Sequence, residues 1–185
     1  QRNMDSGTLI FILSITIRSS TAVLFATVGE IFTERSGVLN LGVEGMMLMG
    51  AFFGILGADK FGTWWLGLLT AIAAGGLMAL LHAVLSIHLR ADQIVGGTAI
   101  NFLALGLTGY LYIDIYGQEG TPTDIPGIPA VDLGFISGVP FVGEVFSDLN
   151  LMIWVALAVW VLVLVGLLRA RLVTLAGAAR SARAR

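Results

Sequence analysis

The chain has 185 residues, of which 57% are hydrophobic and 12% are charged, and its formal net charge at pH 7 is −2. Soluble domains are about 45–50% apolar and about 25% charged, so this composition excludes a water-soluble or disordered protein and indicates a membrane protein. The chain has no cysteine and only two histidines, which excludes disulfides and thiolate metal sites and leaves little for catalysis. Neither enzymatic activity, a metal nor a cofactor is expected.

A helix that crosses a bilayer needs about 20 residues, and five stretches of suitable length and hydrophobicity follow one another along the chain. They cover residues 9–29, 38–58, 64–89, 94–113 and 151–168. The first stretch is the most polar, because Arg18 and a run of Ser and Thr interrupt its middle. We therefore predict an all-α, polytopic membrane protein with about five transmembrane helices, the first of them broken or polar.

Small residues recur at helical spacing in two of the predicted spans. They are Gly50 and Gly54 in the second span, and Ala71, Gly75, Ala79 and Ala83 in the third. Such residues let helix backbones approach closely where lipid supplies no hydrophobic force between helices. The pattern predicts helix–helix contacts along these stripes.

The distribution of charge predicts the orientation of the spans. Residues 117–149 contain five acidic residues and no Lys or Arg, whereas residues 169–185 contain five of the ten basic residues. Basic segments stay in the cytoplasm, so residues 169–185 are expected to form a basic cytoplasmic tail. Counting back through five spans makes residues 117–149 an external loop and puts the N-terminus outside.

Several polar side chains lie in or near the predicted spans, where a charge costs about 2.5–3.5 kcal/mol at a helix centre. Arg18, Glu30 and Glu44 each have two interpretations: a substrate or gating site, or an internal partner that only organises the fold. Thr98 and Asn101 share one helix face. They form either a polar patch that binds a neutral substrate or a set of hydrogen bonds between helices.

Two segments resemble a known family. Residues 34–51, ERSGVLNLGVEGMMLMGA, and residues 91–112, ADQIVGGTAINFLALGLTGYLY, are similar to signature segments of the permease subunits of bacterial binding-protein-dependent ABC importers. The importers of this group transport branched-chain amino acids, ribose and other simple sugars, and nucleosides. The residues of both segments are most similar to its nucleoside and simple-sugar branch. Residues 1–168 are accordingly expected to form a transmembrane permease domain.

The resemblance implies a multi-pass subunit of the inner membrane that carries a small polar solute. Its implied partners are two cytoplasmic ATPase subunits, which would hydrolyse the ATP, a second permease subunit, identical or different, and an external substrate-binding lipoprotein, with no nucleic acid. Carried over, Asn40 and Glu44 fall in the broken helical region of the first signature, and Asn101 falls in the second. Together with Thr98 they are the candidates for the substrate pathway, whereas Arg18 and Glu30 are candidate structural or gating charges.

Two alternatives to an importer permease remain open at this stage. One is an ion-coupled secondary transporter or channel that uses Arg18, Glu30 and Glu44. The other is a nonfunctional permease fragment, because Leu168 is followed by RARLVTLAGAARSARAR, which does not resemble the ATPase-docking segment of the family. A truncated or frameshifted end after about Leu168 is the corresponding expectation.

Overall fold

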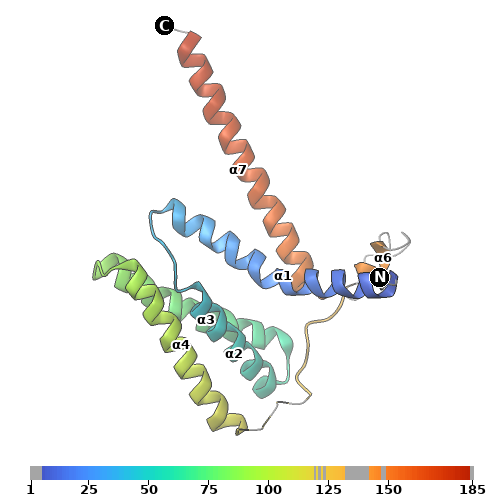
Figure 1. The fold of residues 1–185 in the computed structure, drawn as a ribbon. Helices are drawn as coiled ribbons and strands as arrows, with labels where there is room; N and C mark the ends of the chain where they lie inside the picture. The colour runs from blue at the N-terminus through green and yellow to red at the C-terminus, as the bar shows by residue number, and fades with distance from the viewer. Residues whose placement is uncertain are drawn as a thin grey trace, which may run out of the picture. The chain divides into compact units, whose positions relative to one another are not determined.

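The structure is a computed structural model that describes residues 6–118, 120, 122, 124–131, 142–146 and 149–183; for residues 6, 142, 143 and 171–183 it describes only the backbone. Its regular elements are α1 (Ser6–Arg35), α2 (Val43–Phe61), α3 (Trp64–Ala83), the π-helix η1 (Val84–His88), α4 (Gln93–Tyr116), α6 (Val142–Val145) and α7 (Leu151–Arg183) (Figure 1). Between Ala130 and Asn150 there is a single isolated bridge, and no strand occurs in the described part of the chain. The predicted all-α class is confirmed.

Four of the described helical segments are long and apolar enough to cross a membrane. They are Gly7–Arg35, Trp64–His88, Gln93–Tyr116 and Leu151–Ala170. The remaining long helix, α2, has 19 residues and carries Glu44 in its first turn and Lys60 in its last. Helices of this number and composition confirm a polytopic membrane protein.

The first helix is polar and continuous, which is one of the two forms expected of the first span. The Thr16 hydroxyl donates to the Ile12 carbonyl at 2.7 Å, the Ser20 hydroxyl donates to the Thr16 carbonyl, and the Thr21 hydroxyl donates to the Ile17 carbonyl at 3.2 Å. Each acceptor lies four residues earlier in the same helix, so these hydroxyls are satisfied locally and the helix continues.

The second helix begins at Val43 rather than at residue 38, where the span was predicted to start. Gly37 takes a φ of 83°, in the left-handed region that favours glycine, and the chain turns there. Residues 36–42 are therefore a non-helical connection between α1 and α2. The third predicted span corresponds to α3 followed by η1, and the fourth lies within α4, whose N-cap Asp92 accepts from the Ile94 N–H at 2.8 Å.

The chain divides into two compact units. One combines the segment up to Val28 with the segment from Pro129 onward, and the other is Gly29–Ile128. In the first unit the Trp154 indole N–H donates to the Val131 carbonyl at 3.1 Å. The helix α7 runs on past residue 168 to Arg183, and the side chains of the predicted basic tail from residue 171 lie outside the described residues, as does much of the predicted external loop.

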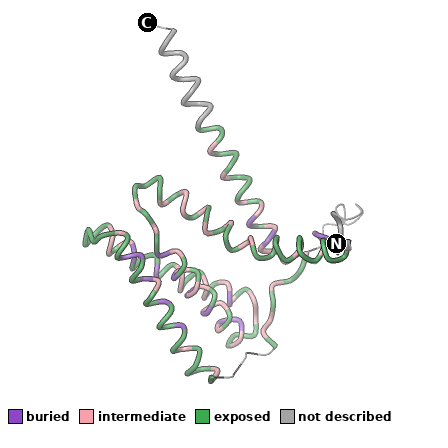
Figure 2. The backbone as a smooth tube through the Cα atoms, in the orientation of Figure 1, coloured by how far each residue is buried: buried purple, intermediate pink, exposed green. Residues whose placement is uncertain are grey.

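In the unit Gly29–Ile128, helix α2 packs against both α3 and α4 (Figure 1). The contact with α3 is made by small residues: a Cβ added at Gly54 would lie 3.2 Å from the Ala71 Cβ, and one at Gly67 would lie 2.6 Å from the Gly54 carbonyl oxygen. The buried cluster of Met49, Met78, Ile100 and Ala104 spans α2, α3 and α4. Figure 2 shows the buried residues along the sides where these helices meet.

Candidate functional site

A pocket lined by both polar and apolar residues lies between α2 and α4. We call it the α2–α4 pocket, and its volume is about 250 Å³. It is lined by Glu44, Gly45 and Leu48 of α2 and by Thr98, Asn101, Phe102 and Leu105 of α4. Three of the four residues predicted for the substrate pathway thus share one pocket, although they come from segments more than 50 residues apart.

The two polar side chains that are free to face a solute are Glu44 and Thr98. Both are exposed on the protein surface. Glu44 lies in the first turn of α2, where the partial positive charge of the helix N-terminus favours a carboxylate. The Thr98 hydroxyl donates to the Ile94 carbonyl at 2.8 Å, which leaves its oxygen able to accept a hydrogen bond. The pocket therefore offers acceptors to the hydroxyl or N–H groups of a polar solute.

Asn101 has a different environment, because the backbone of the α2 start occupies both ends of its amide. Its Oδ1 accepts from the Gly45 N–H at 2.7 Å, and its Nδ2 donates to the Leu41 carbonyl at 2.9 Å. Of the two interpretations of Asn101, hydrogen bonding between helices therefore describes its contacts. Glu44 and Thr98, by contrast, are exposed in the pocket.

The connection formed by residues 36–42 is held by further side chains. Gln93 accepts from the Leu39 N–H at 2.8 Å, and one carboxylate oxygen of Glu30 accepts from the Asn40 N–H at 3.3 Å. Gly97, inside helix α4, packs against this connection, and a Cβ there would lie 2.7 Å from the Leu41 Cβ. Sequence reasoning missed Gln93, since nothing in its local pattern marks it, but a glycine inside an apolar helix could have indicated the close approach at Gly97.

Asn40 lies apart from the other pathway candidates, in a second pocket of about 150 Å³. The lining of that pocket consists of Thr33, Ser36, Val38, Asn40, Met46, Ala79, His82, Ala83 and Ile87. Ala79 and Ala83, predicted as contact residues, line this pocket. His82 is only 3% exposed, and its Nδ1, like Asn40 Oδ1 and Glu30 Oε2, is buried with no hydrogen-bond partner in the described part of the chain.

The remaining candidates have separate positions. Arg18 is exposed on α1 and belongs to the other compact unit. Gly50 and Gly75 lie at the α2–α3 contact, where added Cβ atoms would be 3.4 Å from the Ala71 and Met46 carbonyl oxygens respectively. Among the described residues no group of three or more His, Asp or Glu side chains could hold a metal ion.

In a comparison with known proteins, one family model matches most of the chain. Residues 11–177 match the model of the branched-chain amino acid transport system permease component. The chain is 39% identical over 152 residues to the guanosine ABC transporter permease protein NupQ of Bacillus subtilis, covering 75% of this chain and 45% of that protein. It is 36% identical to the nucleoside ABC transporter permease protein NupC of Lactococcus lactis, covering 76% of this chain and 46% of that protein.

A third relative is the putative glucose ABC transporter permease protein TsgC13 of Haloferax volcanii, 37% identical over 139 residues, with 73% of this chain and 41% of that protein covered. The chain thus spans less than half the length of these curated relatives. No solved structure matches.

Proposed function

Because the chain belongs to the family of branched-chain amino acid transport system permease components, we propose that it forms part of the permease subunit of an ATP-driven importer for nucleosides or simple sugars. Two of its relatives are named as guanosine or nucleoside permeases and one as a putative glucose permease. Nucleosides and sugars share a neutral, hydroxyl-rich surface. The proposal takes that shared chemistry as the substrate class.

The observation that carries the proposal is the α2–α4 pocket. Its carboxylate, Glu44, and the hydroxyl of Thr98 face an open volume of about 250 Å³ between two helices. Ionisable side chains inside a membrane protein are costly and usually line a substrate path or a water-filled cavity. A carboxylate and a hydroxyl that line one pocket provide acceptors for the hydroxyl groups of a neutral solute without requiring a charged substrate.

The proposed assembly follows from the same family assignment. The permease pairs with a second permease subunit in the inner membrane, receives solute from an external binding lipoprotein, and is driven by cytoplasmic ATPase subunits. In the proposed orientation the N-terminus and residues 117–149 are external and the C-terminal residues are cytoplasmic. ATP hydrolysis resides in the partner subunits, and the permease itself is a transport component.

Uptake measurements test this function. The permease, expressed with its partner subunits in cells that lack their own uptake systems, is assayed with radiolabelled guanosine, glucose and leucine. We expect guanosine or glucose to accumulate and depletion of ATP to abolish the accumulation, while an uncoupler that leaves ATP intact has little effect. Accumulation that follows an ion gradient without ATP, or accumulation of leucine alone, contradicts the proposal.

A further inference from the structure

Helix α2 begins without a cap of its own. The first N–H groups of a helix have no partner within the helix, and a Ser, Thr, Asp or Asn side chain at the N-cap usually accepts from the second or third helical residue. The N-cap of α2 is Gly42, which has no side chain and provides no such bond. The helix then starts with Val43, Glu44 and Gly45, so Gly45 is the third helical residue.

The missing acceptor comes from another helix. Asn101 of α4, 56 residues later in the chain, places its Oδ1 2.7 Å from the Gly45 nitrogen. This is one of the two N–H groups that a local N-cap side chain satisfies. The same amide donates through Nδ2 to the carbonyl of Leu41, directly before the N-cap. One side chain thus satisfies a backbone donor and a backbone acceptor on either side of the helix start.

We propose that Asn101 is a positioning residue, a helix cap supplied by α4 that fixes the first turn of α2 and thereby holds Glu44 in the wall of the α2–α4 pocket. The consequence for transport rests on the proposed function, whereas the cap itself does not. Asn101 is distinguished from a substrate ligand by its contacts, because a solute could bind its amide only by leaving Gly45 N–H or Leu41 C=O unpaired.

Steric constraints explain why the cap is not local. A Cβ at Gly42 would lie 3.1 Å from the Ile100 Cγ2, and a Cβ at Gly45 would lie 2.9 Å from the Asn101 Cα. The start of α2 is therefore pressed against the backbone of α4. A serine or asparagine at position 42 would have to displace Ile100, which is only 1% exposed. The close approach that removes room for a local cap also brings Asn101 within reach of Gly45.

Amide hydrogen exchange of the permease in lipid nanodiscs tests the cap without requiring transport. Asn101→Leu removes both hydrogen bonds at similar size, whereas Asn101→Asp keeps the acceptor for Gly45. Because an N-cap contributes about 1 kcal/mol, we expect exchange of the Gly45 amide to be roughly five- to tenfold faster in the Leu variant. The Asp variant keeps the acceptor for Gly45 but loses the donor to Leu41, so its exchange rate is expected to lie between those of the wild type and the Leu variant. Thr98→Val, which changes the same pocket at a hydroxyl that donates to Ile94 within α4 and not to the backbone of α2, serves as the matched control.

Uptake provides the second readout. We expect the Leu variant to lower the maximal uptake rate and the Asp variant to restore part of it, in parallel with Gly45 protection. Unchanged Gly45 exchange in the Leu variant, or equal loss of protection in Thr98→Val, would overturn the cap. If the wild type shows no uptake while Gly45 exchange responds as expected, the proposed function fails and the capping role stands.

Discussion

At the scale of single residues, Glu44 is the side chain that we propose to bind the solute. It is exposed in the α2–α4 pocket at a helix N-terminus, where a carboxylate is favoured. A charged acceptor that binds solute contributes about 1.5–3 kcal/mol, so Glu44→Ala is expected to lower uptake roughly tenfold or more. The measurement is initial uptake of labelled guanosine or glucose, normalised to the amount of permease in the membrane.

The matched control is Glu34→Ala. Glu34 is also an exposed glutamate, at the end of α1, but it does not line the pocket. We expect near wild-type uptake for this variant. If Glu44→Ala shows wild-type uptake and expression, Glu44 does not take part in transport.

Close packing at the start of α2 leads to a second residue-scale prediction. A Cβ at Gly97 would lie 2.9 Å from the Gly42 backbone nitrogen, whereas a Cβ at Gly106 in the same helix meets nothing within 4 Å. Overpacking typically costs about 1–3 kcal/mol, so Gly97→Ala should unfold at lower temperature. Gly106→Ala should be neutral or up to about 1 kcal/mol more stable because alanine is the better helix former. Thermal unfolding in detergent, followed by tryptophan fluorescence, compares the two; equal shifts contradict the close approach at Gly97.

The sequence alone was sufficient to select polar candidate residues, but it did not predict which of them lie together. A polar residue in an apolar span stands out locally, which is why Glu44, Thr98 and Asn101 could be selected as candidates. Their convergence in one pocket depends on how α2 docks on α4, which is set by contacts 56 or more residues apart in sequence. The same limitation explains why Asn40, two residues before Gly42, was grouped with Glu44 but lies in the other pocket.

At the scale of helices, small residues determine the α2–α3 contact. Added Cβ atoms at Gly54 and Gly67 would meet Ala71 and the Gly54 backbone at 3.2 and 2.6 Å respectively. The periodic small residues indicated such a contact in advance, since only small side chains permit it. The π-helix η1 and the delayed start of α2 had no comparable signal, because both depend on backbone geometry, such as the positive φ of Gly37, and not on side-chain periodicity.

A cysteine pair tests the register of α2 against α3. The chain has no native cysteine, so Gly54→Cys with Ala71→Cys introduces the only two thiols. Their Cβ separation of 3.2 Å is close to the roughly 3.5–4.5 Å found in disulfides. We expect a mild oxidant to join them, as detected by mass spectrometry of the cleaved protein. The pair Gly54→Cys with Gly76→Cys should stay reduced, because Gly76 meets nothing within 4 Å; a disulfide in that pair instead would show a different register.

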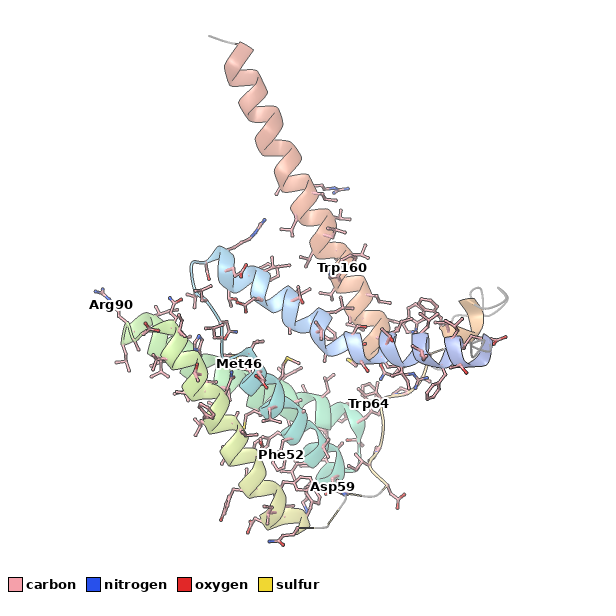
Figure 3. All side chains as sticks on the ribbon, in the orientation of Figure 1. Met46, Phe52, Asp59, Trp64, Arg90 and Trp160 are labelled. Atoms are coloured by element: carbon pink, nitrogen blue, oxygen red, sulfur yellow. The ribbon has the colours of Figure 1, made fainter. Side chains whose placement is uncertain are left out.

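At the scale of the whole molecule, the amino-acid composition was sufficient to predict a membrane protein, and the described helices agree with that prediction. The proposed orientation rests on charge. Figure 3 shows Arg90 and Asp59 at opposite ends of the helical unit formed by α2, α3 and α4, and Lys60 pairs with Asp59 at 4.0 Å, so each end carries a basic residue. The orientation therefore rests on residues 169–185, which contain five of the ten basic residues and which the positive-inside rule places in the cytoplasm. Counting back through the spans puts the end with Arg90 on the same side.

Reporter fusions test that orientation. Alkaline phosphatase, which folds only outside the cytoplasm, is inserted after Gly127, and green fluorescent protein, which is fluorescent in the cytoplasm, is inserted after Arg90. We expect active phosphatase and a fluorescent protein at these respective sites. The reverse pattern, with inactive phosphatase after Gly127, would invert the proposed topology.

The central claim is that the α2–α4 pocket lies on the path of a polar solute. The direct measurement is the rate at which a water-soluble thiol reagent modifies Thr98→Cys in the otherwise cysteine-free chain, with and without guanosine or glucose, in the assembled transporter. Leu103→Cys, on the same helix but outside the pocket, is the control. The account predicts modification of Cys at position 98 that substrate slows, with no effect of substrate at position 103. A thiol at position 98 that never reacts, or reacts at the same rate with and without substrate, would contradict it.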